Sequence, residues 1–177
     1  MVAIRKIGQI RHFIDDETAA KLVHAFVTSR LDSCNALVYG LPDSYITKLQ
    51  LIQNTAARLV ARIPRSQHIT PVLQSLHWLP IKKRAAYKIL LMTYKALNQL
   101  APQYISDIVT YYKPVRNLRS SNKLSLTVTS RPSTKFYGER AFMYAAPSLW
   151  NNLPLQVRSS ITVSSFKNRL KTHLFNI

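Results

Sequence analysis

The stretch from Ile81 to Leu100 constrains the fold more than any other part of the chain. At 100° per residue, its apolar side chains cover most of a helical circumference, and Arg84, Lys88 and Lys95 fill the one narrow polar lane. A helix that is apolar on so many sides is normally packed among neighbours. We therefore predict that this stretch is the central helix of a helical core, too polar to span a membrane.

The first turn of this predicted helix combines two unfavourable features. Pro80 suits the first helical position, but Leu79 offers no side-chain oxygen to cap the remaining N–H groups. Lys82, Lys83 and Arg84 add three positive charges at the positive end of the helix dipole, each costing about 0.3–1 kcal/mol at an exposed site. A bound phosphate would relieve both problems. A solvated, locally frustrated first turn is the alternative interpretation.

Composition favours a mainly α-helical, intracellular protein. The 177 residues suit one domain or two small ones, and 47% of them are hydrophobic. Only three glycines occur, which argues against a turn-rich all-β protein. The single Cys34 excludes an internal disulfide, and its apolar helical surroundings predict a buried thiol. We expect a nuclear or cytoplasmic location, because the sequence has neither a signal peptide nor 18 consecutive apolar residues.

Positive charge increases along the chain. The formal net charge is +18, of which residues 1–40 contribute +1, residues 41–112 contribute +7 and residues 113–177 contribute +10. Such a gradient, in a chain with enough apolar residues for a core, indicates a polyanionic partner. Nucleic acid is the commonest partner of this kind, and an anionic membrane surface is its competitor.

Helix signals occur throughout the chain. Asp15, Asp16, Glu17 and Thr18 are typical of a helix start, so we interpret the acidic residues as capping groups rather than metal ligands. Asp43 or Ser44 is expected to cap a second helix that ends before Pro64. Shorter helices are predicted after Pro102, with Tyr104, Ile105, Ile108 and Val109 buried, and around Trp150. Thr162 or Ser164 would start a last helix, with Phe166, Leu170 and Leu174 facing inward.

The composition changes at about residue 112, which predicts a boundary between regions 1–112 and 113–177. Residues 111–142 contain seven basic side chains, one acidic side chain and many hydroxyls. Leu124, Leu126 and Val128 alternate with polar residues, so a short strand is expected there. The basic residues, with Tyr111, Tyr112, Phe136 and Tyr137 nearby, suit phosphate contacts and base stacking. A flexible basic connector is the alternative.

The sequence argues against autonomous catalysis. Two-metal chemistry needs several converging carboxylates, but the chain has only seven acidic residues and none between Asp43 and Asp107. It contains neither a glycine-rich phosphate loop nor a GxSxG motif, and its five histidines lack the spacing of metal ligands. We therefore expect no catalytic residues, no metal and no cofactor.

Several separated motifs resemble one family. They are SRLDSCNALVYGLPDSYITKLQLIQNTAARLV, HITPVLQSLHWLPIKKRAAYKILLMTYKALNQLAPQYISDIV, YGERAFMYAAPSLWNNLPLQVRSS and SSFKNRLKTHLF. Together they resemble the C-terminal region of reverse transcriptases from non-LTR retrotransposons, in particular the jockey and chicken-repeat group of LINE elements. The resemblance extends from about Ile7 to Phe175, in order and without large gaps.

The resemblance implies a non-catalytic part of an RNA-directed DNA polymerase. Family members carry an endonuclease and a palm with a Tyr/Phe-Ala-Asp-Asp box, whereas Asp15 and Asp16 in FIDDE do not match that box. The chain also lacks the cysteine-histidine knuckle that some elements carry. It is therefore similar to the region after the palm: a mainly α, thumb-like helical bundle, then a basic segment with a short β element and a terminal helix. We expect a truncated or decayed copy that starts at an internal Met1.

Two functions follow as expectations. In the first, the chain holds template RNA or target DNA, and no membrane is expected among its partners. In the second, it is a helical packing module that contacts protein, either the missing polymerase body or a host partner. The predicted phosphate contacts of the first function are Lys82, Lys83, Arg84, Lys88, Arg116, Arg119, Lys123, Arg131 and Lys135.

Overall fold

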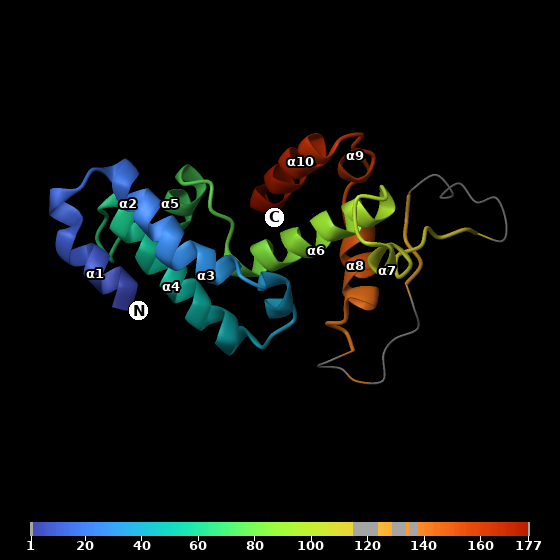
Figure 1. The fold of residues 1–177 in the computed structure, drawn as a ribbon, viewed down its shortest axis with the longest axis horizontal. Coiled ribbons are helices and arrows are strands. Elements are labelled where there is room, and N and C mark those ends of the chain that lie inside the picture. The colour runs from blue at the N-terminus through green and yellow to red at the C-terminus, as the bar shows by residue number, and fades with distance from the viewer. Residues whose placement is uncertain (1, 115–123, 129–133, 135–137, 177) are drawn as a thin grey trace. The chain divides into compact units, whose positions relative to one another are not determined.

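The protein is described by a computed structural model that covers residues 2–114, 124–128, 134 and 138–176 (Figure 1). Its described part is mainly α-helical, which confirms the predicted fold class. The chain divides into two compact units, residues 1–84 and residues 85–177, with the division inside helix α6 (Ile81–Leu97). The boundary that composition predicts at residues 112/113 therefore lies within the second unit.

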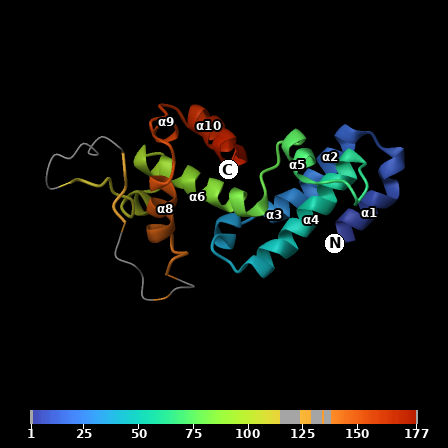
Figure 2. The same ribbon diagram turned by 180° about the vertical axis from the view of Figure 1, so that it is seen from behind.

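The N-terminal unit (residues 1–84) is built from helices around one apolar core. Its helices are α1 (Val2–Ile10), α2 (Asp16–Val23), α3 (Ser29–Asp32), α4 (Asp43–Ala61) and α5 (Thr70–Ser75), joined in part by short 3₁₀ and π turns. Ile4 and Ile7 of α1 pack with Val23, Val27, Ala56 and Val60 in the core. Figure 2 shows α1, α2 and α4 from behind. Helix α1 was not predicted from the sequence.

Capping at the start of α2 confirms the structural interpretation of the acidic cluster. Asp15 is the N-cap residue, and its carboxylate accepts a hydrogen bond from the Thr18 N–H at 3.3 Å. This bond holds the pKa of Asp15 below its usual value. Helix α4 differs from the prediction, because Asp43 is its first helical residue and Pro42 occupies the cap position without a side-chain bond.

Cys34 is exposed, so the prediction of a buried thiol is wrong. Helix α3 ends at Asp32, and Cys34 itself has a φ of 53°, in the left-handed region. Because the helical repeat stops before this residue, its side chain no longer follows the apolar face that the sequence pattern assumed.

The C-terminal unit (residues 85–177) contains most of α6 together with α7 (Gln103–Ser106), α8 (Phe142–Asn151), α9 (Leu155–Arg158) and α10 (Val163–Asn176). The predicted helices around Trp150 and after Thr162 are confirmed, and Thr162 accepts a hydrogen bond from the Ser165 N–H at 3.2 Å. The expected buried side of α7 is wrong in part. Tyr104 and Ile108 are exposed, because this helix is only four residues long and covers little surface.

Aromatic side chains make the centre of the C-terminal unit. The rings of Tyr94 on α6 and Phe166 on α10 stack with centroids 4.2 Å apart, and the Trp150 ring lies 5.9 Å from that of Phe166. All three side chains are buried, as are Ala85, Ile89, Leu90 and Ala96 of α6. The prediction that this helix is packed on many sides is therefore confirmed, with Lys88 exposed in its polar lane.

No strand is found among the described residues. The predicted strand at 124–128 is instead a single antiparallel bridge between Tyr111 and Leu126. Within the same described ranges, no helix is both long and apolar enough to cross a membrane.

Candidate nucleic-acid interface

Side chains of α4 make hydrogen bonds to the backbone at the start of α6. The Ile81 N–H donates to Oε1 of Gln50 on α4 at 2.9 Å. The amide of Gln53, also on α4, donates to the Leu79 carbonyl at 2.9 Å. A side chain from a distant helix thus provides one of the bonds that a phosphate would have provided. Sequence reasoning missed it, because Gln50 lies 31 residues before Ile81.

Two of the three cations in this turn also have internal partners. Nη1 of Arg84 lies 2.7 Å from a carboxylate oxygen of Asp32, and its Nε donates to the Leu79 carbonyl at 3.0 Å. The Arg84 side chain is only 14% exposed, which gives it a structural role. Lys82 lies 3.4 Å from Asp43 in a pair that is 74% and 83% exposed. Such surface pairs contribute about 0–1 kcal/mol, so Lys82 can exchange its partner for another anion.

Lys83 and Lys88 make no ion pair among the described residues. Lys83 is half-buried and belongs to the N-terminal unit, whereas Lys88 is exposed and belongs to the C-terminal unit. That Lys83 and Lys88 contact a phosphate stays a prediction.

The remaining predicted contacts lie outside the described residues; they are Arg116, Arg119, Lys123, Arg131 and Lys135. The residues on either side of positions 115–123 are joined to each other by backbone hydrogen bonds. The Tyr112 N–H donates to the Ser125 carbonyl at 2.9 Å, and the Thr127 N–H donates to the Thr110 carbonyl at 2.9 Å. We call residues 110–112 and 124–127 the paired segments.

Helices α8 and α9 hold the second paired segment. The indole Nε1 of Trp150 donates to the Leu124 carbonyl at 2.9 Å, and Nη1 of Arg158 donates to the Ser125 hydroxyl at 3.3 Å. Partial burial lowers the pKa of Arg158, but a guanidinium stays charged at neutral pH. The paired segments are therefore fixed to the core of the C-terminal unit.

Two tyrosines and a lysine lie at the exposed side of the first paired segment. Tyr111 is 43% exposed and Tyr112 is 53% exposed, and Lys113 beside them is exposed. Exposed aromatic faces next to a cation suit base stacking with a phosphate contact, as the sequence predicted for these residues. Phe136 and Tyr137, the other two aromatics of that prediction, lie outside the described residues.

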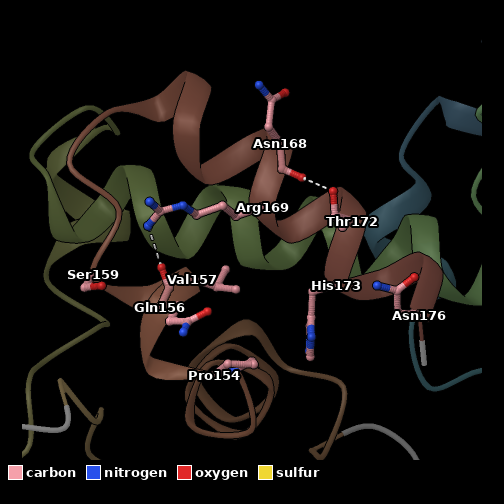
Figure 3. Close-up of a pocket in the computed structure, with 9 residues that line it drawn as sticks. All are labelled: Pro154, Gln156, Val157, Ser159, Asn168, Arg169, Thr172, His173 and Asn176. Atoms are coloured by element: carbon pink, nitrogen blue, oxygen red, sulfur yellow. Dashed lines mark hydrogen bonds between the residues drawn. The ribbon is translucent and has the colours of Figure 1, made fainter.

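A cleft between α9 and α10 was not predicted (Figure 3). Its volume is about 540 Å³, and its lining contains Gln156 and Val157 of α9 and Arg169 and His173 of α10. Nη1 of Arg169 donates to the Gln156 carbonyl at 2.7 Å. Helical spacing predicted only that Arg169 lies off the buried face of α10. It could not indicate that α9 packs beside it.

Within the part of the chain that the structure describes, no three His, Cys, Asp or Glu side chains lie close enough together to hold a metal ion. Comparison of the chain with protein-family models, curated proteins and solved structures finds no match.

Proposed function

We propose that this chain is a non-catalytic, nucleic-acid-binding segment of a non-LTR retrotransposon RNA-directed DNA polymerase. The observation that carries the proposal is the excess of cations in the C-terminal unit, which has thirteen basic and only two acidic side chains. Because the unit has only two side-chain carboxylates, most of these cations cannot pair with a carboxylate of their own unit. A polyanionic strand would neutralise them and release its counterions.

Exposed groups in the C-terminal unit suit such a strand. Lys88, Lys113 and Arg169 are exposed, and so are Tyr111 and Tyr112. Phosphate contacts give affinity and register, while stacking on tyrosines tolerates any base sequence. The combination favours an unpaired strand, whose bases are free to stack.

The N-terminal unit contrasts with this pattern. It has twelve basic and five acidic side chains, and Arg11, Lys21, Arg62, Lys82 and Arg84 all lie in ion pairs. We therefore expect the C-terminal unit to contribute more to strand binding than the N-terminal unit.

The test is a salt titration of the full chain with a fluorescently labelled, single-stranded RNA. The logarithm of the affinity should fall linearly with the logarithm of the salt concentration, by about 0.7 per phosphate contact. Lys88→Gln and Lys113→Gln should each reduce that slope by about 0.7. Lys21→Gln is the matched control, because Lys21 is an exposed lysine of the N-terminal unit, 2.7 Å from Glu17.

Two results would contradict the proposal. One is binding no tighter than that of an unrelated protein of equal net charge. The other is an affinity that does not change with salt. Parentage has a separate test, since the proposal predicts an Ala-Asp-Asp box encoded upstream in the same genomic reading frame.

A second candidate function is protein association through the N-terminal unit. Phe13 is 80% exposed, Leu37 is 71% exposed and Phe26 is 52% exposed, and a partner that covers such apolar side chains would remove them from water. The partner would be the polymerase body. Sedimentation of the chain with that body should then show a complex that survives high salt and is weakened by Phe13→Ser, whereas strand binding should not respond to this variant.

A further inference from the structure

The cleft between α9 and α10 is lined mostly by residues with polar side chains. Among the described residues that line it, Pro154 and Val157 are the only apolar ones, and the others have polar side chains: Gln156, Ser159, Asn168, Arg169, Thr172, His173 and Asn176. None of these is a carboxylate. Its volume of about 540 Å³ lies within the range of about 300–1,000 Å³ that is usual for small-ligand sites.

Arg169 is held in place without being saturated. One of its five N–H donors, on Nη1, is used by the Gln156 carbonyl at 2.7 Å. The side chain is exposed, so its other donors remain open to a phosphate. Figure 3 shows the Arg169 side chain reaching from α10 to the backbone of α9, which fixes the guanidinium at one edge of the cleft.

His173 supplies a flat ring in the same cleft. Figure 3 shows the ring extending from α10 toward Pro154. Partial burial lowers the pKa of His173 and so favours the neutral imidazole, which has one donor and one acceptor nitrogen. A ring of this kind can stack on a nucleobase, as histidine does in proteins that bind single strands.

We propose that this cleft takes one nucleotide of an unpaired strand, with its phosphate at Arg169 and its base against His173. The inference rests on the proposed function and names the surface that carries it. Amide and hydroxyl groups both donate and accept hydrogen bonds, as base edges do, whereas an inorganic phosphate offers mainly acceptor oxygens and would leave the acceptor groups of this lining unmatched.

The first experiment compares two variants of α10 that lose the same charge. Arg169→Gln should weaken binding of the full chain to a single-stranded RNA by about tenfold, the loss expected for a charge-assisted hydrogen bond. Lys167→Gln, on the same helix and also exposed but outside the cleft lining, should weaken it by less than about threefold. Equal effects of the two substitutions would overturn the proposal.

An uncharged pair of variants tests the base contact. His173→Ala should weaken binding by about fivefold to tenfold, the loss of one stacked base. Ser164→Ala should change it little, because Ser164 is an exposed residue of α10 outside the cleft lining. Circular dichroism checks that His173→Ala still folds. If it does not, Arg169→Gln and the chemical shifts described next decide the question.

Chemical shifts of the backbone amides around the cleft identify the ligand. Adenosine monophosphate and the single-stranded RNA should both shift the amides of residues 156–159 and 168–173, whereas inorganic phosphate should not. Equal shifts with inorganic phosphate would indicate an anion site and overturn the proposal. Shifts with adenosine monophosphate but not with the RNA would also overturn it. Strand binding that leaves these amides unshifted would overturn the cleft but not the proposed function, whereas absence of any strand binding would overturn both.

Discussion

The side-chain amide of Asn151 makes both backbone hydrogen bonds to Leu126 that a neighbouring β-strand would make. The Leu126 N–H donates to Oδ1 of Asn151 at 2.8 Å, and Nδ2 of Asn151 donates to the Leu126 carbonyl at 2.9 Å. Leu126 is 2% exposed and forms its bridge to Tyr111 on the other side. One side chain of α8 thus takes the place of a strand neighbour on this side of the extended segment.

Asn151→Ala should destabilise the C-terminal unit. The substitution leaves the buried N–H and carbonyl of Leu126 without their partner, at a cost of about 1–3 kcal/mol in the free energy of unfolding. Chemical denaturation measures the change, and hydrogen exchange should show faster exchange of the Leu126 amide. Asn152→Ala is the control, since Asn152 is the exposed neighbour. Equal losses from the two substitutions would contradict the role assigned to Asn151.

Tyr94→Phe should lower stability by removing one buried hydroxyl. The Tyr94 hydroxyl donates to the Ser160 carbonyl at 2.9 Å, and burial raises the pKa of this phenol. We expect a loss of about 0.5–2 kcal/mol, because the ring stack on Phe166 is retained while the Ser160 carbonyl loses its donor. Thermal unfolding measures it. Tyr104→Phe, at a position 68% exposed, should leave the melting temperature nearly unchanged.

Arg11→Met should destabilise the N-terminal unit strongly. The buried Arg11 guanidinium donates to the carbonyls of Leu59 and Val60, each at 2.8 Å, and to that of Ile14 at 2.9 Å, and it also pairs with Asp16. Losing these bonds should cost about 2–5 kcal/mol. Denaturant unfolding of Arg11→Met and of Arg5→Met, an exposed arginine of α1, gives the comparison. A similar midpoint for both variants would refute this role.

Asp16 should make stability dependent on pH in acid. The hydrogen bond from Arg11, helped by the charges of Arg11 and Arg62, holds the pKa of Asp16 below its usual value. The ionised form is therefore favoured in the folded state. Its contribution is complete above about pH 4 and is lost as the pH falls through the lower, folded-state pKa.

Asp16→Asn should accordingly be less stable than the natural chain at pH 7, and the difference should disappear in strong acid. Denaturant unfolding at a series of pH values measures this. Glu17→Gln, which removes an exposed carboxylate 2.7 Å from Lys21, is the control and should show a smaller difference at pH 7. A gap between Asp16→Asn and the natural chain that is constant with pH would be inconsistent with this assignment.

Periodicity and capping chemistry are local, and for that reason they predicted much of the fold. The apolar circumference of α6, the helix around Trp150, the inward face of α10 and the cap at Asp15 depend on residues a few positions apart. Predictions failed where the local repeat ended or was very short, as at Cys34 and in α7.

The candidate site was less predictable than the fold. The sequence alone determined that cations exceed carboxylates most strongly toward the C-terminus. The sequence did not distinguish surface cations from internal ones. A basic residue off the apolar face of a helix has the same spacing whether its side chain lies in solvent or bonds to a distant backbone group.

Only tertiary structure made that separation. Arg11 meets Leu59 across 48 residues, Arg84 meets Asp32 across 52 residues, and Arg169 borders a cleft that exists because α9 packs beside α10. The physical reason is that helical propensity acts between neighbours in sequence, whereas burial and pairing of a charge depend on which helices fold against it.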